Sequence, residues 1–111
     1  MLPKIVDAVH GRNTEVHIDS GIRSGQDVLR AVALGANAAY IGRPYLYGLG
    51  AYGRKGVSRV LEILRSEFDT TMALVGERDV ACVGPHILEH VPQDWLPSSS
   101  HSSTTRRPGE V

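Results

Sequence analysis

The chain has 111 residues, enough for one domain, and its 12 basic residues balance its 12 acidic residues. The resulting net charge of zero leaves no long-range field that would favour nucleic acid or an anionic membrane as a partner. A single cysteine, Cys82, excludes an internal disulfide, and no apolar run approaches the roughly 18 residues of a membrane span, so we expect a cytoplasmic protein.

The first predicted elements are a helix and a short strand. Residues 2–9 carry apolar side chains at helical spacing, and Gly11 is placed to end that helix. Residues 15–19 then alternate between apolar and polar, which predicts a strand that ends at Asp19. Because Gly21 follows, the backbone can adopt an unusual angle directly after this strand.

A second helix and a second strand follow. Ser24 is a good N-cap, and Asp27 three residues later completes a variant of the capping box. The helix that begins there is expected to end at Gly35. Residues 38–41 form a short apolar run typical of a buried parallel strand, which the Gly-Arg-Pro of residues 42–44 stops.

The clearest helical pattern lies in the second half of the chain. Residues 45–53 are rich in glycine and tyrosine and predict a short helix or an ordered loop. Residues 54–75 repeat apolar side chains every three or four positions, so we expect a helix with a core-facing stripe that ends at Gly76. A short helix or turn is predicted near 85–90.

Each of the two predicted strands runs into a loop that contains glycine and arginine. Backbone amides beside a glycine turn, a helix N-terminus and a guanidinium group together suit a phosphate. In this interpretation Ile22 and Arg23 supply main-chain amides, Arg23 also supplies a charge, and Asp19 either contacts a ligand hydroxyl or caps its own turn. The candidate phosphate-site residues are Asp19, Ser20, Gly21, Ile22, Arg23, Gly42 and Arg43.

Two such junctions in tandem are expected where the last strands of a (β/α)8 barrel hold a phosphate. Two parallel strands cannot bury both faces of a sheet, so the architecture is expected to be incomplete. In that setting, Tyr45 and Tyr47 are expected to pack between the barrel rim and the last helix.

The histidines do not predict a metal site. Cys82, His86 and His90 recur every four residues, but Pro85 interrupts a helix there and no fourth ligand is evident. His17 alternates with its apolar neighbours and therefore faces the other side of its strand. A packed structural histidine is favoured there over a position near a cofactor.

The order and spacing of these motifs resemble the FMN-dependent α-hydroxy acid dehydrogenases and oxidases. That family includes flavin-type lactate dehydrogenases, glycolate oxidase and mandelate dehydrogenase. The similarity covers roughly residues 2–80 and rests on the runs 17–28, 31–36, 41–44 and 71–74. The last run, Thr-Met-Ala-Leu, favours this family over other FMN or phosphate-binding barrels.

The resemblance implies an α/β chain that holds the last two βα units of a (β/α)8 TIM barrel. Residues 1–80 would be the C-terminal segment of an FMN-binding barrel, 81–96 a short extension and 97–111 a disordered tail. The candidate residues would hold the FMN phosphate and ribityl chain. Ser20 is a mild departure, since the family often has glycine there, and it leaves backbone contacts possible.

The implied activity is oxidation of a 2-hydroxy acid to a 2-oxo acid, with electrons passing to FMN. The family's catalytic histidine and carboxylate-binding arginine match no residue here, so we expect no catalytic residue in this chain and no activity from it alone. The implied partners are FMN, a substrate only in a completed barrel, and either a complementary N-terminal barrel chain or further copies of this chain. The alternative is a non-catalytic phosphate-binding or interaction remnant of a truncated barrel.

Overall fold

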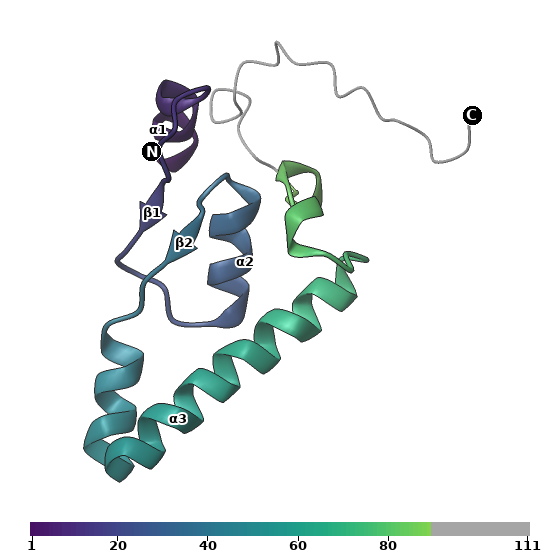
Figure 1. Ribbon diagram of the computed structural model, residues 1–111. Helices are drawn as coiled ribbons and strands as arrows, with labels where there is room; N and C mark the ends of the chain where they lie inside the picture. The colour runs from purple at the N-terminus through teal and green to yellow at the C-terminus, as the bar shows by residue number, and fades with distance from the viewer. Residues whose placement is uncertain (90–111) are drawn as a thin grey trace.

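The computed structural model describes residues 1–89, and Figure 1 shows helices arranged around a small sheet. The predicted tail over 97–111 lies outside the described residues, and so does the end of the predicted extension. In chain order the elements are α1 (Leu2–Val9), β1 (His17–Ile18), α2 (Gly25–Ala33), β2 (Ala38–Ala39), α3 (Arg43–Leu74) and the 3-10 turns η1 (Val80–Cys82) and η2 (Pro85–Ile87).

The two strands are parallel neighbours joined by a helix. His17 of β1 pairs with Ala38 of β2, and Ile18 pairs with Ala39. Tyr40 N–H extends the pairing by donating to the carbonyl of Ile18 at 2.8 Å. The parallel arrangement matches the prediction, although each strand is shorter than expected. The described residues form a βαβ unit with flanking helices rather than a closed barrel.

Helix α2 covers one face of this sheet. The predicted capping box is confirmed: Ser24 Oγ accepts from the Asp27 N–H at 3.1 Å, and Asp27 Oδ2 accepts from the Ser24 N–H at 3.1 Å. Gly35, with φ of 96°, ends the helix as expected. Buried Ile22, Ala31 and Ala36 form the core beneath the strands, together with the partly buried residues Leu2, Ile18, Val28, Ala39 and Ile41.

Helix α3 folds back on itself as two arms. Tyr52 and Gly53 have non-helical backbone angles, and Gly53 has a φ of 58° that favours glycine. The arms approach closely at Gly48 and Gly56, where a Cβ on Gly48 would lie 2.6 Å from the Gly56 carbonyl oxygen. The sequence pattern predicted one element that ends at residue 53 and a helix that begins at residue 54. The structure has a break at this place, between a short and a long arm of α3 (Figure 1).

Two expectations about packing are wrong. The long arm of α3 buries Leu64 and Met72, but Leu61 of the same predicted stripe is 53% exposed. Tyr45 and Tyr47 are also exposed rather than packed between a rim and a helix. The reason is the same in both cases, because the described part of the chain gives α3 only α2 as a large neighbour.

The segment after α3 turns back toward α2. The predicted element near 85–90 is the single 3-10 turn η2, and it contacts α2.

Within residues 1–89, no helix is long and apolar enough to cross a membrane.

Candidate functional site

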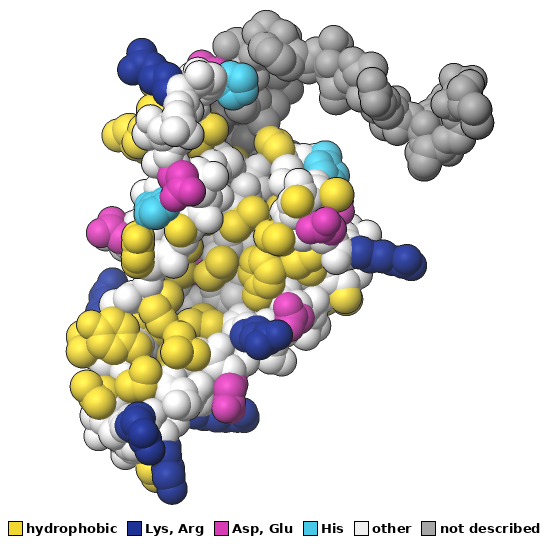
Figure 2. Space-filling model, in the orientation of Figure 1, with side chains coloured by type: hydrophobic (Ala, Val, Ile, Leu, Met, Phe, Trp, Pro, Cys, Tyr) yellow, Lys and Arg dark blue, Asp and Glu magenta, His cyan; other side chains and the backbone are white. Residues whose placement is uncertain are grey.

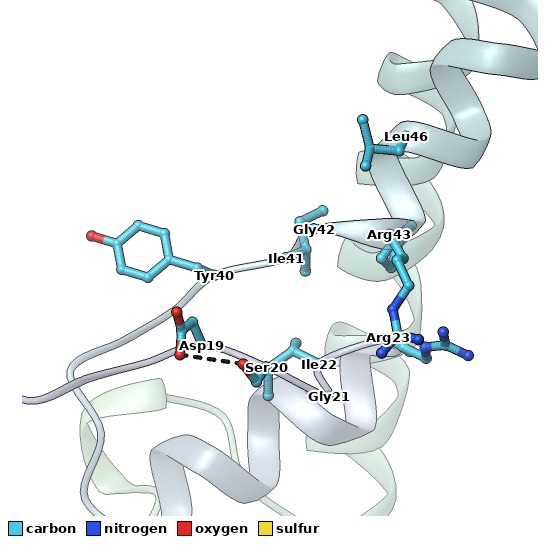
Figure 3. A pocket seen from close by; sticks show the side chains of 11 residues that line it. Asp19, Ser20, Gly21, Ile22, Arg23, Tyr40, Ile41, Gly42, Arg43 and Leu46 are labelled. Atoms are coloured by element: carbon cyan, nitrogen blue, oxygen red, sulfur yellow. Dashed lines mark hydrogen bonds between the residues drawn. The ribbon is translucent and has the colours of Figure 1, made fainter.

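The loops that follow β1 and β2 open onto one pocket of about 420 Å³ (Figure 3). All seven candidate residues line it. Sequence reasoning missed four further lining residues, of which Tyr40 is polar and the other three are apolar. The full lining is Asp19, Ser20, Gly21, Ile22, Arg23, Tyr40, Ile41, Gly42, Arg43, Pro44 and Leu46.

The first loop makes a sharp turn at Ser20 and Gly21. Both residues have left-handed backbone angles, with φ of 72° and 81°. Gly21 therefore adopts the unusual angle expected of it, while Ser20 adopts one that costs a residue with a side chain about 1–2 kcal/mol. Ser20 Oγ donates to Asp19 Oδ1 at 3.5 Å. Within residues 1–89, Asp19 accepts no backbone N–H, so the turn-capping alternative has no support there.

Arg23 and Arg43 both line the pocket, and Figure 3 draws their side chains on the same side of it. Neither guanidinium has an acidic partner among the residues that the structure describes. Two positive charges that line one pocket attract an anion that enters it. Arg43 is also the first residue of α3, with Gly42 as its N-cap, so unpaired amides of the first helical turn add to the positive end.

The prediction that the main-chain amide of Arg23 binds a phosphate is wrong. The backbone N–H of Arg23 was expected to face a phosphate, but it donates to Asp27 Oδ2 at 3.1 Å. Arg23 can therefore offer its guanidinium to a ligand but not its main-chain amide. The carboxylate of Asp27 holds this loop against the start of α2 by accepting from both Arg23 and Ser24.

The other end of the pocket carries oxygen-bearing side chains. Asp19 and Tyr40 lie there, on the side away from the two guanidinium groups (Figure 3). Tyr40 Oη lies 3.1 Å from His17 Nδ1, and His17 Nε2 lies 3.0 Å from Glu15 Oε2. His17 is thus an exposed, hydrogen-bonded side chain, and the expectation of a packed structural histidine is wrong.

Of the three side chains considered as metal ligands, Cys82 and His86 are described by the structure, and His90 lies outside the described residues. His86 Nε2 contacts Glu77 Oε1 at 2.6 Å. No group of three or more metal-ligating side chains occurs within residues 1–89.

Comparison with known proteins identifies the family. The model of the family described as FMN-dependent dehydrogenase matches residues 1–90. The chain belongs to this family. Mouse 2-hydroxyacid oxidase 1 is 48% identical over 92 residues, which is 83% of this chain and 25% of the relative. The L-lactate dehydrogenase of Caulobacter vibrioides is 50% identical over 93 residues, or 83% of this chain and 24% of the relative.

Solved structures of this family contain a matching portion. Mandelate oxidase with benzoyl-formic acid superposes with a TM-score of 0.71 at 48% identity, covering 75% of this chain and 24% of that one. A soluble mutant of (S)-mandelate dehydrogenase from Pseudomonas putida gives a TM-score of 0.74 at 40% identity. The superposition covers 82% of this chain and 25% of the mandelate dehydrogenase chain. The predicted family is therefore confirmed, and the chain spans about a quarter of the length of the curated relatives it matches.

Proposed function

We propose that this chain holds the phosphate end of FMN in an oxidoreductase that converts a 2-hydroxy acid to a 2-oxo acid. The observation that carries this proposal is the convergence of two successive Gly–Arg junctions on one pocket, which Arg23 and Arg43 both line without an acidic partner in the described chain. The sequence similarity to 2-hydroxyacid oxidases and L-lactate dehydrogenases supports oxidation of a 2-hydroxy acid as the class of reaction.

The residues of the pocket fit the two parts of the FMN tail. Arg23, Arg43 and the first turn of α3 would bind the phosphate. Asp19 would accept hydrogen bonds from hydroxyl groups of the ribityl chain, and the turn at Ser20 and Gly21 lets the backbone come close to it. Positive charge at one end and oxygen acceptors at the other match a ligand that joins an anion to a polyol.

Bound FMN would supply the redox chemistry by taking up the electron pair of the substrate. The role of this chain is to bind and orient the cofactor. None of the described histidines lines the pocket, so we propose that proton abstraction and substrate binding use residues outside this chain.

We also propose that the site is completed by another polypeptide, either a complementary barrel portion or a second copy of this chain. Figure 2 shows hydrophobic side chains gathered on the face formed by α2 and the first arm of α3. On the first arm of α3, Leu46 and Leu49 are each about half exposed, at 51% and 49%, and on the long arm Leu61 is 53% exposed. A surface of this kind is typical of a protein interface.

The proposed phosphate site is tested by replacing Arg43 with alanine in this chain, completing the barrel with its missing portion, and titrating the complex with FMN. Loss of one charge-assisted contact of roughly 1.5–3 kcal/mol should weaken FMN binding about 10- to 150-fold, measured from the change in flavin fluorescence. Arg59→Ala is the matched control, because Arg59 lies on the same helix, pairs with Glu62 and does not line the pocket.

Equal affinities for FMN in the Arg43→Ala and Arg59→Ala variants would contradict the proposal. Binding of inorganic phosphate with no preference for FMN would instead favour the alternative of a non-catalytic phosphate-binding module.

A further inference from the structure

A carboxylate on the long arm of α3 binds the first backbone N–H of α2. Glu67 Oε2 accepts from the Gly25 N–H at 2.8 Å, and the two residues are 42 positions apart in the sequence. Gly25 is the first residue of α2, so this contact satisfies a backbone group that has no partner within its own helix. The two backbones also approach closely, because a Cβ on Gly25 would lie 2.7 Å from the carbonyl carbon of Glu67.

The side chain of Glu67 is engaged with this helix end rather than with a cation. Glu67 is partly buried, and within residues 1–89 it forms no ion pair. The partial positive charge at the N-terminus of a helix stabilises a carboxylate placed there. The long arm of α3 therefore fixes the place where α2 begins.

Two carboxylates hold the loop that carries Arg23, and they connect it to different elements. Asp27 accepts from the N–H groups of Arg23 and Ser24, so it ties the loop to the first turn of the helix that follows. Glu67 ties that same turn to α3, the helix that begins at Arg43. With Asp27 alone, the loop and α2 could shift together relative to α3, and the contact with Glu67 opposes that shift.

Further contacts connect the long arm of α3 to the second pocket loop. The sheet pairing extends to Ile18 and Tyr40, and both of these residues precede the arginine of their loop. Beyond the sheet, the two arms of α3 pack closely at Gly48 and Gly56. The short arm, the long arm and α2 thus form a closed frame (Figure 1), which Glu67 completes where the long arm meets the start of α2.

We propose that Glu67 is a positioning residue of the phosphate site, which fixes the loop of Arg23 relative to Arg43. The inference rests on the proposed function. Glu67 does not line the pocket, so it acts through the backbone of Gly25 and not on the ligand. Two guanidinium groups bind one anion more tightly when both are held in place beforehand, because binding then has less chain to order.

The proposal is tested in the complex of this chain with the missing barrel portion, by titration with FMN and with riboflavin. Riboflavin lacks the phosphate, so the ratio of the two affinities measures the phosphate contacts alone. A variant that merely unfolds part of the protein loses binding sites for both ligands and leaves this ratio unchanged. Flavin fluorescence gives both affinities.

Glu67→Asp and Glu67→Gln separate the reach of the side chain from its charge. Glu67→Asp keeps the charge but is one carbon–carbon bond shorter, whereas Glu67→Gln keeps the length and an oxygen that accepts. Glu67→Asp should weaken FMN about five- to thirtyfold, as expected when about one residue must be ordered on binding, and should leave riboflavin within about twofold. Glu67→Gln should keep both affinities within about threefold of the original.

Two further variants show where Glu67 acts. Glu62→Ala is the matched control, because Glu62 lies on the same arm, is exposed and pairs with Arg59, and it should leave the ratio unchanged. In a chain that already carries Arg23→Ala, Glu67→Asp should change the FMN affinity by less than about twofold, because its effect passes through Arg23.

The outcomes distinguish the two proposals. If the original complex prefers FMN to riboflavin and Glu67→Asp keeps that preference, the role of Glu67 is overturned and the FMN proposal stands. A larger loss in Glu67→Gln than in Glu67→Asp would also overturn it, since charge and not reach would then matter. If the original complex binds FMN no more tightly than riboflavin, the proposed function is overturned, and the role of Glu67 falls with it.

Discussion

At the scale of single residues, Asp27 connects the helix cap to the pocket. Its Oδ2 accepts from the N–H groups of Arg23 and Ser24, and its Oδ1 accepts from Arg30 at 3.2 Å. Burial opposes ionisation of Asp27, but hydrogen bonds from Ser24 and Arg23 and the charge of Arg30 outweigh it, so the pKa of this carboxyl lies below its usual value. The ionised form is the one that holds the loop.

The pH dependence of this cap follows from the direction of the shift. Because the pKa of Asp27 is lower in the folded state, its contribution is present above the unfolded pKa near 3.9 and is lost as the pH falls through the folded value. We expect Asp27→Ala to destabilise α2 by about 0.5–2 kcal/mol near neutral pH. Amide hydrogen exchange of α2 measures this, and the gap between variant and original chain should narrow below about pH 4.

A gap that stayed constant down to pH 3 would contradict the assignment, since it would mean that the charge of Asp27 is irrelevant. Asp7→Ala is a suitable control, because Asp7 lies on α1 and is exposed.

At the scale of elements, the contact between α2 and α3 depends on Gly25. Its N–H donates to Glu67 Oε2 at 2.8 Å, and a Cβ on Gly25 would lie 2.5 Å from the Leu64 carbonyl oxygen. The start of α2 therefore meets the long arm of α3 backbone to backbone. This contact fixes the loop that carries Arg23, because that loop leads directly into α2.

We expect Gly25→Ala to push the two helices apart, since the added methyl meets backbone atoms that cannot rotate away. The cost should be about 1–3 kcal/mol, as for other overpacked sites, and should appear as faster hydrogen exchange in both α2 and the long arm of α3. Gly50→Ala is the matched control, because nothing lies within 4 Å of a Cβ there. It should be neutral or stabilise α3 by up to about 1 kcal/mol.

At the scale of the whole molecule, the described residues leave much apolar surface without a partner. The sheet has two strands, so each has an unpaired outer edge, and only one face is covered by α2. No large side chain is more than 98% buried in residues 1–89. A single two-stranded sheet of this kind is marginal in water.

We therefore expect the isolated chain to be marginally stable, molten or oligomeric. Sedimentation and calorimetry on the purified chain measure this, and the expected results are association that rises with concentration or a broad thermal transition. A monomer that melts sharply and cooperatively would contradict the expectation. It would show that the apolar face needs no second polypeptide.

The sequence alone was enough to predict the local features of this protein. The cap at Ser24, the end of α2 at Gly35 and the boundary at Gly53 each depend on residues within a turn or two, and all three occur where expected. The motif spacing also indicated the family, because a family retains the order of its motifs along the chain. These features need no knowledge of what lies opposite them.

Which surfaces and which polar atoms remain free for a ligand or partner depends on contacts between distant parts of the chain. Leu61 and Leu64 belong to the same apolar stripe of the helix, yet Leu61 is exposed and Leu64 is buried. Burial of each side chain depends on whether a distant part of the chain packs against it. The tertiary structure also pairs the amide of Arg23 with Asp27 and joins His17 to Tyr40 across the strands. Periodicity along a chain defines the faces of a helix or strand, whereas the partner of each face is set by packing in three dimensions.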